Sequence, residues 1–224
     1  LHSFDVRNHE GLEDGWVNGN IKVTGNKVVL LLTDGTHSTN QLVVLQEGEH
    51  NWENKILEPF TTPRFNIRLA VDGDWWAVAG GDVSRPDILK VKLWKEELFR
   101  QDIELPGVSA RDVRDVVLES PFLVVGGAGR SDETRNGWIQ VFLMEDLNSA
   151  PSLIKTLQFP GFYFSELLCT RLVWGCLMEA EGNDEKSLVL FEKKALLDAA
   201  TLPEETGRNI IHLGTTYYTL VDMN

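Results

Sequence analysis

The chain has 224 residues, of which 42% are hydrophobic and 25% are charged, a composition typical of an ordinary globular protein. Its formal net charge of −13 produces a field that repels polyanions, which argues against general nucleic-acid binding. The longest uninterrupted apolar run, from Val28 to Leu32, is far too short to cross a bilayer, so we expect no membrane span.

Cysteine usage bears on the cellular compartment. Cys169 and Cys176 are the two cysteines, and they fall on neighbouring strands of a predicted hairpin that turns at Thr170 and Arg171. In that register they do not face each other, so we predict buried free thiols rather than a disulfide. The sequence also contains no Asn-x-Ser/Thr glycosylation site. These features favour an intracellular location, cytoplasmic or nuclear.

Short apolar strands recur along the chain with a nearly constant period. Runs that begin at Val28, Trp75, Phe122 and Leu172 are 47, 47 and 50 residues apart. Each run is preceded by a predicted strand, at Asn20–Thr24, Phe65–Val71, Val113–Leu118 and about Phe164–Cys169. Each is followed by two more, the first of which begins at Gln41, Ile88, Trp138 and Ser187, and the second at Lys55, Asp102, Thr156 and Asn209. The repeating unit therefore has four strands.

A period in the forties with four strands per unit is typical of a β-propeller blade. We therefore predict an all-β fold, a single β-propeller over residues 1–224 with complete four-stranded antiparallel units at about 19–60, 64–107, 111–161 and 162–214. Residues 1–18 are expected to supply the last strand of a preceding blade, and residues 215–224 the first strand of a further one. The chain would then be part of a larger propeller. Lys193–Ala200 is predicted to form a short inserted helix.

Strand polarity supports this order. The second strand of each unit is apolar on both sides, as expected for a strand that is covered by blades on either side. The fourth strand of the second unit alternates, with Phe99, Gln101, Ile103 and Leu105 on one side and charged residues on the other. The glycines at 126, 127 and 129 resemble a phosphate-binding loop only superficially, because they lead into another strand rather than a helix. We predict that they allow neighbouring blades to approach closely.

One unit carries a family-like motif. Ala79-Gly80-Gly81-Asp82, a loop, and then Ile88 to Trp94 (ILKVKLW) resemble the small-residue strand, turn and closing tryptophan of the WD40 family. Lys95 stands where that family usually has Asp, and no Gly-His pair precedes a first strand. The resemblance implies a divergent WD40-like propeller without the usual side-chain hydrogen-bond network, whose blades are held together mainly by packing. Seven tryptophans, mostly on strands, are expected to contribute to that packing.

No catalytic or metal-binding pattern emerges from the sequence. The five histidines are scattered, and none has a second His or Cys at metal-ligand spacing. Ser109 and Ser165 have no histidine at a recognisable offset, and there is no Gly-x-Ser-x-Gly motif. We therefore expect no catalytic residues, no metal and no cofactor, and no enzymatic activity.

Charge is distributed unequally between the two ends of the predicted blades. Loops that join the second strand to the third, and the fourth to the next first strand, open on one face of a propeller, and they carry Arg64, Arg85, Arg111, Arg130 and Arg135. The opposite loops are strongly acidic. Arginine binds carboxylates and phosphates through two parallel hydrogen bonds, so the arginine-bearing face is predicted to bind an acidic or phosphorylated segment of a partner. Alternatively, these arginines pair locally with acidic residues of the same loops.

Three functions follow from these patterns. The first is a non-catalytic protein-interaction module. Among WD-like propellers, the resemblance extends to substrate receptors of ubiquitin ligases, including those of the F-box type. The second is a structural scaffold subunit of a large assembly, which would use the acidic face. The third, least supported, is a propeller enzyme.

Overall fold

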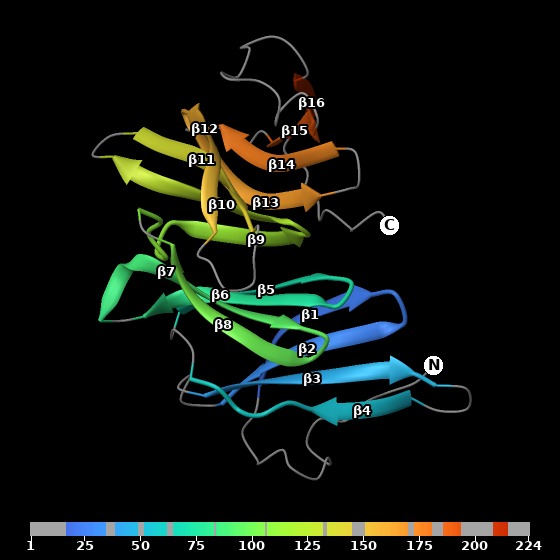
Figure 1. The fold of residues 1–224 in the computed structure, drawn as a ribbon. Coiled ribbons are helices and arrows are strands. Elements are labelled where there is room, and N and C mark those ends of the chain that lie inside the picture. The colour runs from blue at the N-terminus through green and yellow to red at the C-terminus, as the bar shows by residue number, and fades with distance from the viewer. Residues whose placement is uncertain are drawn as a thin grey trace. The chain divides into compact units, whose positions relative to one another are not determined.

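The protein is described by a computed structural model that covers residues 17–34, 39–48, 52–61, 65–82, 84–105, 107–131, 134–144, 151–169, 173–180, 186–193 and 208–214 (Figure 1). Its regular secondary structure is almost entirely β. The predicted strands of residues 1–16 and 215–224, and all but the first residue of the predicted helix at Lys193–Ala200, lie outside the described residues. Within the described residues, no helix has the length and apolar character needed to cross a membrane.

Within the described ranges, sixteen strands form four antiparallel sheets, each of them a simple four-stranded meander. The first sheet contains β1 (Val17–Thr24), β2 (Lys27–Thr33), β3 (Asn40–Glu47) and β4 (Trp52–Ile56), and the second β5 (Phe65–Asp72), β6 (Trp75–Asp82), β7 (Arg85–Lys95) and β8 (Leu98–Leu105). The third contains β9 (Val113–Glu119), β10 (Phe122–Ser131), β11 (Thr134–Leu143) and β12 (Ser152–Pro160), and the fourth β13 (Phe162–Cys169), β14 (Val173–Ala180), β15 (Lys186–Glu192) and β16 (Arg208–Gly214). These sheets are the blades of a β-propeller, which confirms the predicted fold class.

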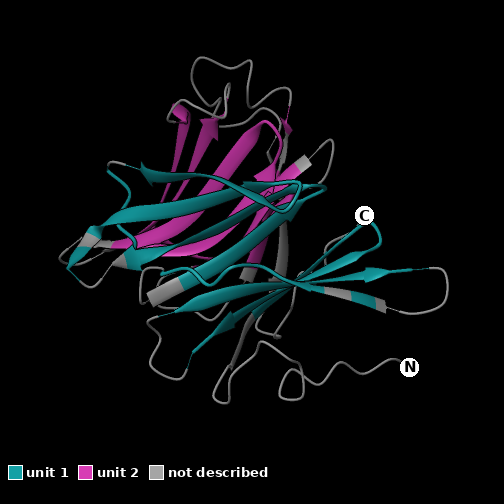
Figure 2. Cartoon of the chain, turned by 60° about the horizontal axis from the view of Figure 1, so that its bottom comes forward, with its two compact units in different colours: residues 1–111 teal, residues 112–224 magenta. Residues whose placement is uncertain are grey.

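The chain divides into two compact units, residues 1–111 and 112–224, each of which contains two blades (Figure 2). In the first unit, the two sheets bury a shared apolar cluster. β2 and β3 supply Val29, Leu31, Leu42 and Val44, and the second blade supplies Leu69, Trp76, Val78 and Trp94. Each buried Val, Leu or Trp side chain stabilises the fold by about 1.5–3 kcal/mol relative to an exposed one, so this interface is a principal source of stability for the unit.

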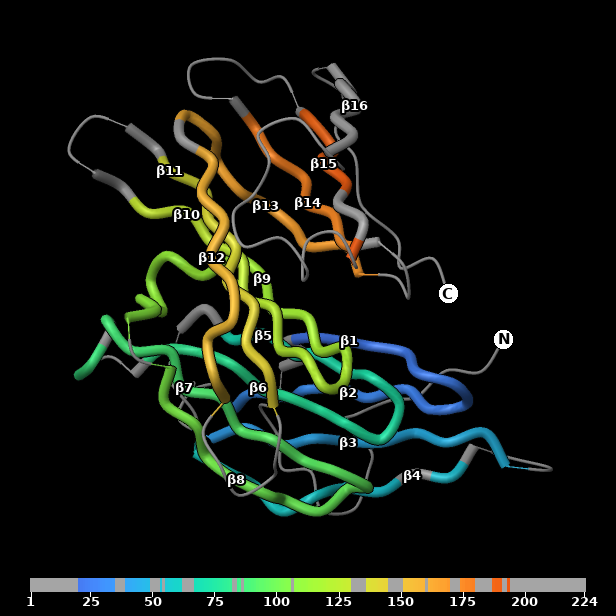
Figure 3. The backbone as a smooth tube through the Cα atoms, turned by 45° about the horizontal axis from the view of Figure 1, so that its top comes forward, coloured from blue at the N-terminus to red at the C-terminus, as the bar shows by residue number. Residues whose placement is uncertain are grey.

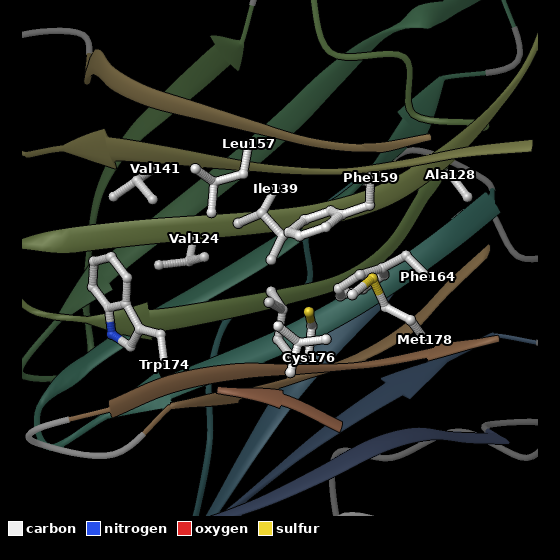
Figure 4. Close-up of a cluster of buried hydrophobic side chains, with 12 residues drawn as sticks. Val124, Ala128, Ile139, Val141, Leu157, Phe159, Phe164, Trp174, Cys176 and Met178 are labelled. Carbon is white, nitrogen blue, oxygen red and sulfur yellow. The ribbon is translucent and has the colours of Figure 1, made fainter. Parts of the chain in front are cut away.

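The second unit repeats this arrangement between its own two blades (Figure 4). Val124, Ile139 and Leu157 come from the third blade, and they meet Phe164 and Cys176 of the fourth. The predicted role of close approach between blades is confirmed for Gly126, where a Cβ atom would come within 2.4 Å of the Phe164 ring. Phe164 is completely buried, so the ring can occupy this position only because residue 126 has no side chain. The prediction is wrong for the other two glycines, because a Cβ atom on Gly127 would meet Trp138 of its own blade and one on Gly129 would have no atom nearer than 3.8 Å.

The first strands of adjacent blades lie side by side, β1 with β5 in one unit and β9 with β13 in the other (Figure 3). Each first strand has an irregular register near its start, for example between Asn18 and Asn20 in β1 and between Val113 and Asp115 in β9. Such bulges increase local twist and redirect side chains. The redirected residues then bridge the blades: the Asn20 amide donates to the Ile67 carbonyl at 3.4 Å, and the Asp115 carboxylate accepts from the Leu167 N–H at 2.9 Å.

Strand polarity agrees with prediction in most respects. β2 is buried along Val29 to Thr33, and at the end of β8 Ile103 and Leu105 are buried while Glu104 is exposed. Phe99 departs from the predicted alternation because its side chain is 52% exposed. The cause is a register shift opposite Leu93 and Trp94, which interrupts the alternation at Arg100. Irregular register on an outer strand also makes that edge a poor template for pairing with another strand.

Candidate functional site

In the first unit, the arginine-bearing loops of the sequence prediction include Arg85 at the start of β7 and Arg111 after β8. Both residues are exposed. An Arg85 Nη1 atom lies 3.1 Å from Glu104 Oε1, and Lys90 Nζ lies 3.9 Å from the same oxygen. Both partners of the Arg85 pair are about half exposed, and such surface pairs contribute roughly 0–1 kcal/mol. Glu104 is therefore a weak competitor that an incoming carboxylate or phosphate can replace. Arg64 lies outside the described residues.

In the second unit, the structure brings Arg130 and Arg135 together. They are direct register partners in the β10–β11 hairpin, one step from its loop. The backbone therefore places two arginine residues at facing positions of one hairpin. Arginine is the residue type that binds carboxylates and phosphates through two parallel hydrogen bonds, so this pair of positions favours an anionic ligand.

The opposite loops, predicted to be acidic, contain a network of ion pairs instead of bare carboxylates. In the first unit, Glu97 in the β7–β8 turn lies 3.3 Å from Lys27 Nζ and 2.6 Å from Lys55 Nζ, and both lysines belong to the neighbouring blade. Lys27 also contacts Asp74 at 3.4 Å. Hydrogen bonding from Lys55, with further contributions from Lys27, holds the pKa of the Glu97 carboxyl below its ordinary value, although partial burial acts in the opposite direction.

The Glu97 turn has an uncommon backbone. Glu96 and Glu97 have φ values of 52° and 65°, the conformation of a type I′ hairpin turn, in which Asn-Gly or Gly-Gly is preferred. Two glutamates in this conformation cost backbone energy that glycine would avoid. The ion pairs of Glu97 offset part of that cost, because they join the turn to the first blade.

In the second unit, the equivalent loops contain a compact polar and aromatic group. Glu119 ends β9, and its carboxylate accepts hydrogen bonds from the Lys193 ammonium and from the Trp174 indole N–H. The Lys193 nitrogen also lies 5.3 Å from the ring centroids of Phe122 and Trp174. Sequence reasoning missed this group, because 74 residues separate Lys193 from Glu119. One feature of the sequence could have indicated it. Trp76 and Trp174 occupy the same position in their blades, because each is the second residue of the second strand.

The structure also tests the predictions made for the two cysteines and for the closing tryptophan of the WD40-like motif. Neither cysteine forms a disulfide, and Cys169 pairs with Trp174 while Cys176 pairs with Leu167, so the predicted offset of the two thiols is confirmed. Cys176 is buried as predicted, but the prediction is wrong for Cys169, which is half-buried at the end of β13, and the predicted turn residues Thr170 and Arg171 lie outside the described residues. Trp94, the closing tryptophan of the WD40-like motif, is buried and packs against Phe60 with a centroid distance of 4.9 Å. Among the residues that the structure describes, no group of three His, Cys, Asp or Glu side chains could hold a metal ion.

Comparisons with known proteins show distant structural similarity alone. No family model matches the sequence, and no curated protein sequence matches it. The chain is similar in structure to a neuraminidase-like protein from A/bat/Guatemala, with 13% identity, a TM-score of 0.46, and coverage of 83% of this chain and 50% of that one. It is also similar to the WD40 domain of SCAP from fission yeast, with 8% identity, a TM-score of 0.34, and coverage of 93% and 66%. Pyrococcus horikoshii acylaminoacyl peptidase gives 11% identity, a TM-score of 0.44, and coverage of 78% and 35%.

The chain thus spans between about a third and two thirds of the length of these solved structures. It is a β-propeller with distant resemblance to WD40 and neuraminidase propellers, and no family is assigned to it.

Proposed function

We propose that this propeller is a non-catalytic protein-interaction module that binds an acidic or phosphorylated segment of a partner protein through its arginine-bearing loops. The observation that carries the proposal is the direct pairing of Arg130 with Arg135 beside the β10–β11 loop. Arg85, which forms an exposed ion pair with Glu104, supports it in the other unit. Loops on a rigid sheet scaffold are the usual place for such recognition.

The chemistry favours an anion with two or more oxygens that can accept parallel hydrogen bonds, a carboxylate or a phosphate. The arginine guanidinium presents several N–H groups in a fixed fork, which match the oxygens of a carboxylate or phosphate. A phosphoserine or phosphothreonine carries nearly two negative charges at neutral pH and would overcome the weak competition from Glu104. We propose an intracellular setting, cytoplasmic or nuclear, because neither Cys169 nor Cys176 forms a disulfide.

Within this class, a divergent WD40-like substrate receptor of a ubiquitin ligase is the more specific proposal. It is supported by the arginine-bearing loops and by the WD40-like segment around Trp94, and it remains an analogy from fold. A scaffold subunit of a large assembly is the second candidate. The specific observation in its favour is the ordered network around Glu97, which gives the opposite loops a fixed charge pattern.

Affinity capture with charge-reversed variants tests the proposal. The first variant reverses Arg64, Arg85 and Arg111 to Glu, and the second reverses Arg130 and Arg135. The matched control reverses Arg100 on β8 and Lys22 on β1, which lie away from the β6–β7 and β10–β11 turns. We expect each variant to lose acidic partners that the control keeps, with unchanged thermal unfolding in all three. If all partners are retained by both variants, the arginine-bearing loops are not the binding surface.

A further inference from the structure

Two aromatic rings in the second unit form a corner around a positive charge. The Phe122 and Trp174 rings meet edge to face, with centroids 5.6 Å apart and planes at 77°. The Lys193 nitrogen lies 5.3 Å from both centroids, within the range over which a ring quadrupole attracts a cation. The two rings together therefore attract a cation at the position of the Lys193 nitrogen.

The third side of this corner is the Glu119 carboxylate, which is oriented without help from Lys193. One of its oxygens accepts from the Trp174 indole N–H, and the other accepts from the Lys193 ammonium. Because Trp174 is buried and fixed between register partners Cys169 and Phe191, the carboxylate would keep its direction if the lysine left. The two rings and the carboxylate therefore form a prearranged cation site, which costs less free energy to fill.

Lys193 lies outside the β-strands, whereas the three residues that surround its side chain lie within them. Glu119 ends β9, Phe122 begins β10 and Trp174 lies on β14, so all three are in hydrogen-bonded strands. Lys193 directly follows the end of β15 and has no ladder partner among the described strands. The side chains of Lys193 and Glu119 are 18% and 19% exposed, so solvent reaches the ion pair.

We infer that Glu119, Phe122 and Trp174 form a binding site for an alkylammonium group, and that Lys193 occupies it as a built-in ligand. The external ligand is the side chain of a lysine, unmodified or partly methylated, in a partner protein. This site lies beside the β9–β10 turn, whereas the arginine-bearing loops of the same blade lie at the β10–β11 turn. The inference is therefore independent of the proposed function.

The carboxylate decides which ammonium groups fit. Glu119 accepts an N–H hydrogen bond, so a primary, monomethyl or dimethyl ammonium satisfies it, whereas a quaternary ammonium has no N–H to donate. The two rings bind all four kinds of cation. We therefore expect n-butylammonium, which reproduces the lysine side chain, to bind more tightly than tetramethylammonium.

Lys193 competes with any external ligand because it is tethered. Because Lys193 directly follows β15 and is part of the same chain, its effective concentration at the site is high, so an external lysine needs further contacts or a neutralised Lys193 to displace it. Acetylation of Lys193 removes its charge and would open the site.

The test is a titration of the Lys193→Ala variant with n-butylammonium, followed by NMR of the Trp174 indole N–H. We expect a saturable shift in the millimolar range, and an affinity at least about tenfold higher than that of the wild type. The Lys193→Ala/Glu119→Gln double variant should lose this binding, and tetramethylammonium should bind the single variant more weakly. The matched control is Lys27→Ala, which removes an ammonium group near Trp76 in the other unit. Because this variant keeps Lys193, its Trp174 titration should be the same as that of the wild type.

Thermal unfolding establishes which variants are folded, and Lys193→Gln, which keeps most of the side-chain length, serves if the alanine variant is not. A folded variant that shows no saturable shift overturns the inference. Failure of both variants to fold also overturns it, because Lys193 would then be a permanent structural contact rather than an exchangeable occupant.

Discussion

Lys27 Nζ lies 3.3 Å from Glu97 Oε1, and this ion pair joins the start of β2 in the first blade to the β7–β8 turn of the second. The second unit has the same connection with its charges reversed. There Glu119, at the β9–β10 turn, supplies the negative charge, and Lys193, directly after β15, supplies the positive one. Coulomb attraction does not depend on which blade carries the positive charge and which the negative. Each pair can therefore join the turn between the first and second strands of one blade to the end of the third strand of the next.

The Glu97 network predicts a pH-dependent stability. Replacing Glu97 with Gln should lower the free energy of unfolding at pH 7 by roughly 0.5–1 kcal/mol, a modest value because Lys55 is 60% exposed. The folded-state pKa of Glu97 is lowered, so its contribution is complete above the unfolded-state pKa of about 4.3 and is lost as the pH falls through the lower folded-state value. Urea unfolding at several pH values measures this. A difference between wild type and variant that persists at pH 2 would contradict the ion-pair explanation.

Substitution of the neighbouring residue, Glu96, should have the opposite effect on the free energy of unfolding. Glu96 is exposed and has φ of 52°, so Glu96→Gly should raise the free energy of unfolding by about 0.5–1 kcal/mol by relieving the left-handed conformation. The backbone hydrogen bond from the Glu96 N–H to the Asp74 carbonyl, 2.9 Å long, is retained in the variant. Glu97→Gly is the control, since it gains the same relief but loses the two lysine contacts. Equal stabilisation by both changes would show that those contacts contribute nothing.

Close approach of the third and fourth blades predicts a contrast between two glycines of β10. Gly126→Ala should destabilise the protein by about 1–3 kcal/mol, because its Cβ would overlap the buried Phe164 ring. Gly129→Ala should change stability by less than about 0.5 kcal/mol, since the nearest atom to its Cβ would be 3.8 Å away. Denaturant unfolding of the two variants compares them directly. Similar stabilities would mean that the two blades are not packed through Gly126.

The two thiols should differ in reactivity. Cys176 is completely buried, whereas Cys169 is half-buried at the end of β13. We expect a thiol reagent to label Cys169 slowly in the native protein and to label Cys176 only after unfolding, because buried thiols are protected. Mass spectrometry of the labelled peptides distinguishes the two sites. Isolation of a disulfide between them from fresh protein would contradict the register of β13 and β14.

The fold could be predicted from the sequence because each blade repeats its own local pattern. The second strands that begin near Val28, Trp75 and Phe122 are apolar on both faces, and this burial requires a sheet on either side. The exposed Phe99 could not be predicted, because a bulge at Arg100 shifts the register without a sequence signal.

The candidate sites were less accessible to sequence reasoning. Arg130 and Arg135 could be placed together, because a hairpin joins positions that are close in sequence. The contacts of Glu97 with Lys27 and of Lys193 with Glu119 join residues 70 and 74 positions apart, and both depend on how one blade packs against the next. No local periodicity carries that information.

Binding of an acidic or phosphorylated segment by the arginine-bearing loops can be measured with a phosphopeptide library. Fluorescence-labelled peptides in matched phosphorylated and unphosphorylated forms are titrated with the wild-type chain, with the Arg130→Glu/Arg135→Glu variant and with the Arg100→Glu/Lys22→Glu control. We expect selective binding of acidic or phosphorylated peptides that weakens with added salt, is lost in the arginine variant and is kept in the control. Binding that is indifferent to peptide charge, or that is unaffected by reversal of Arg130 and Arg135, would contradict it.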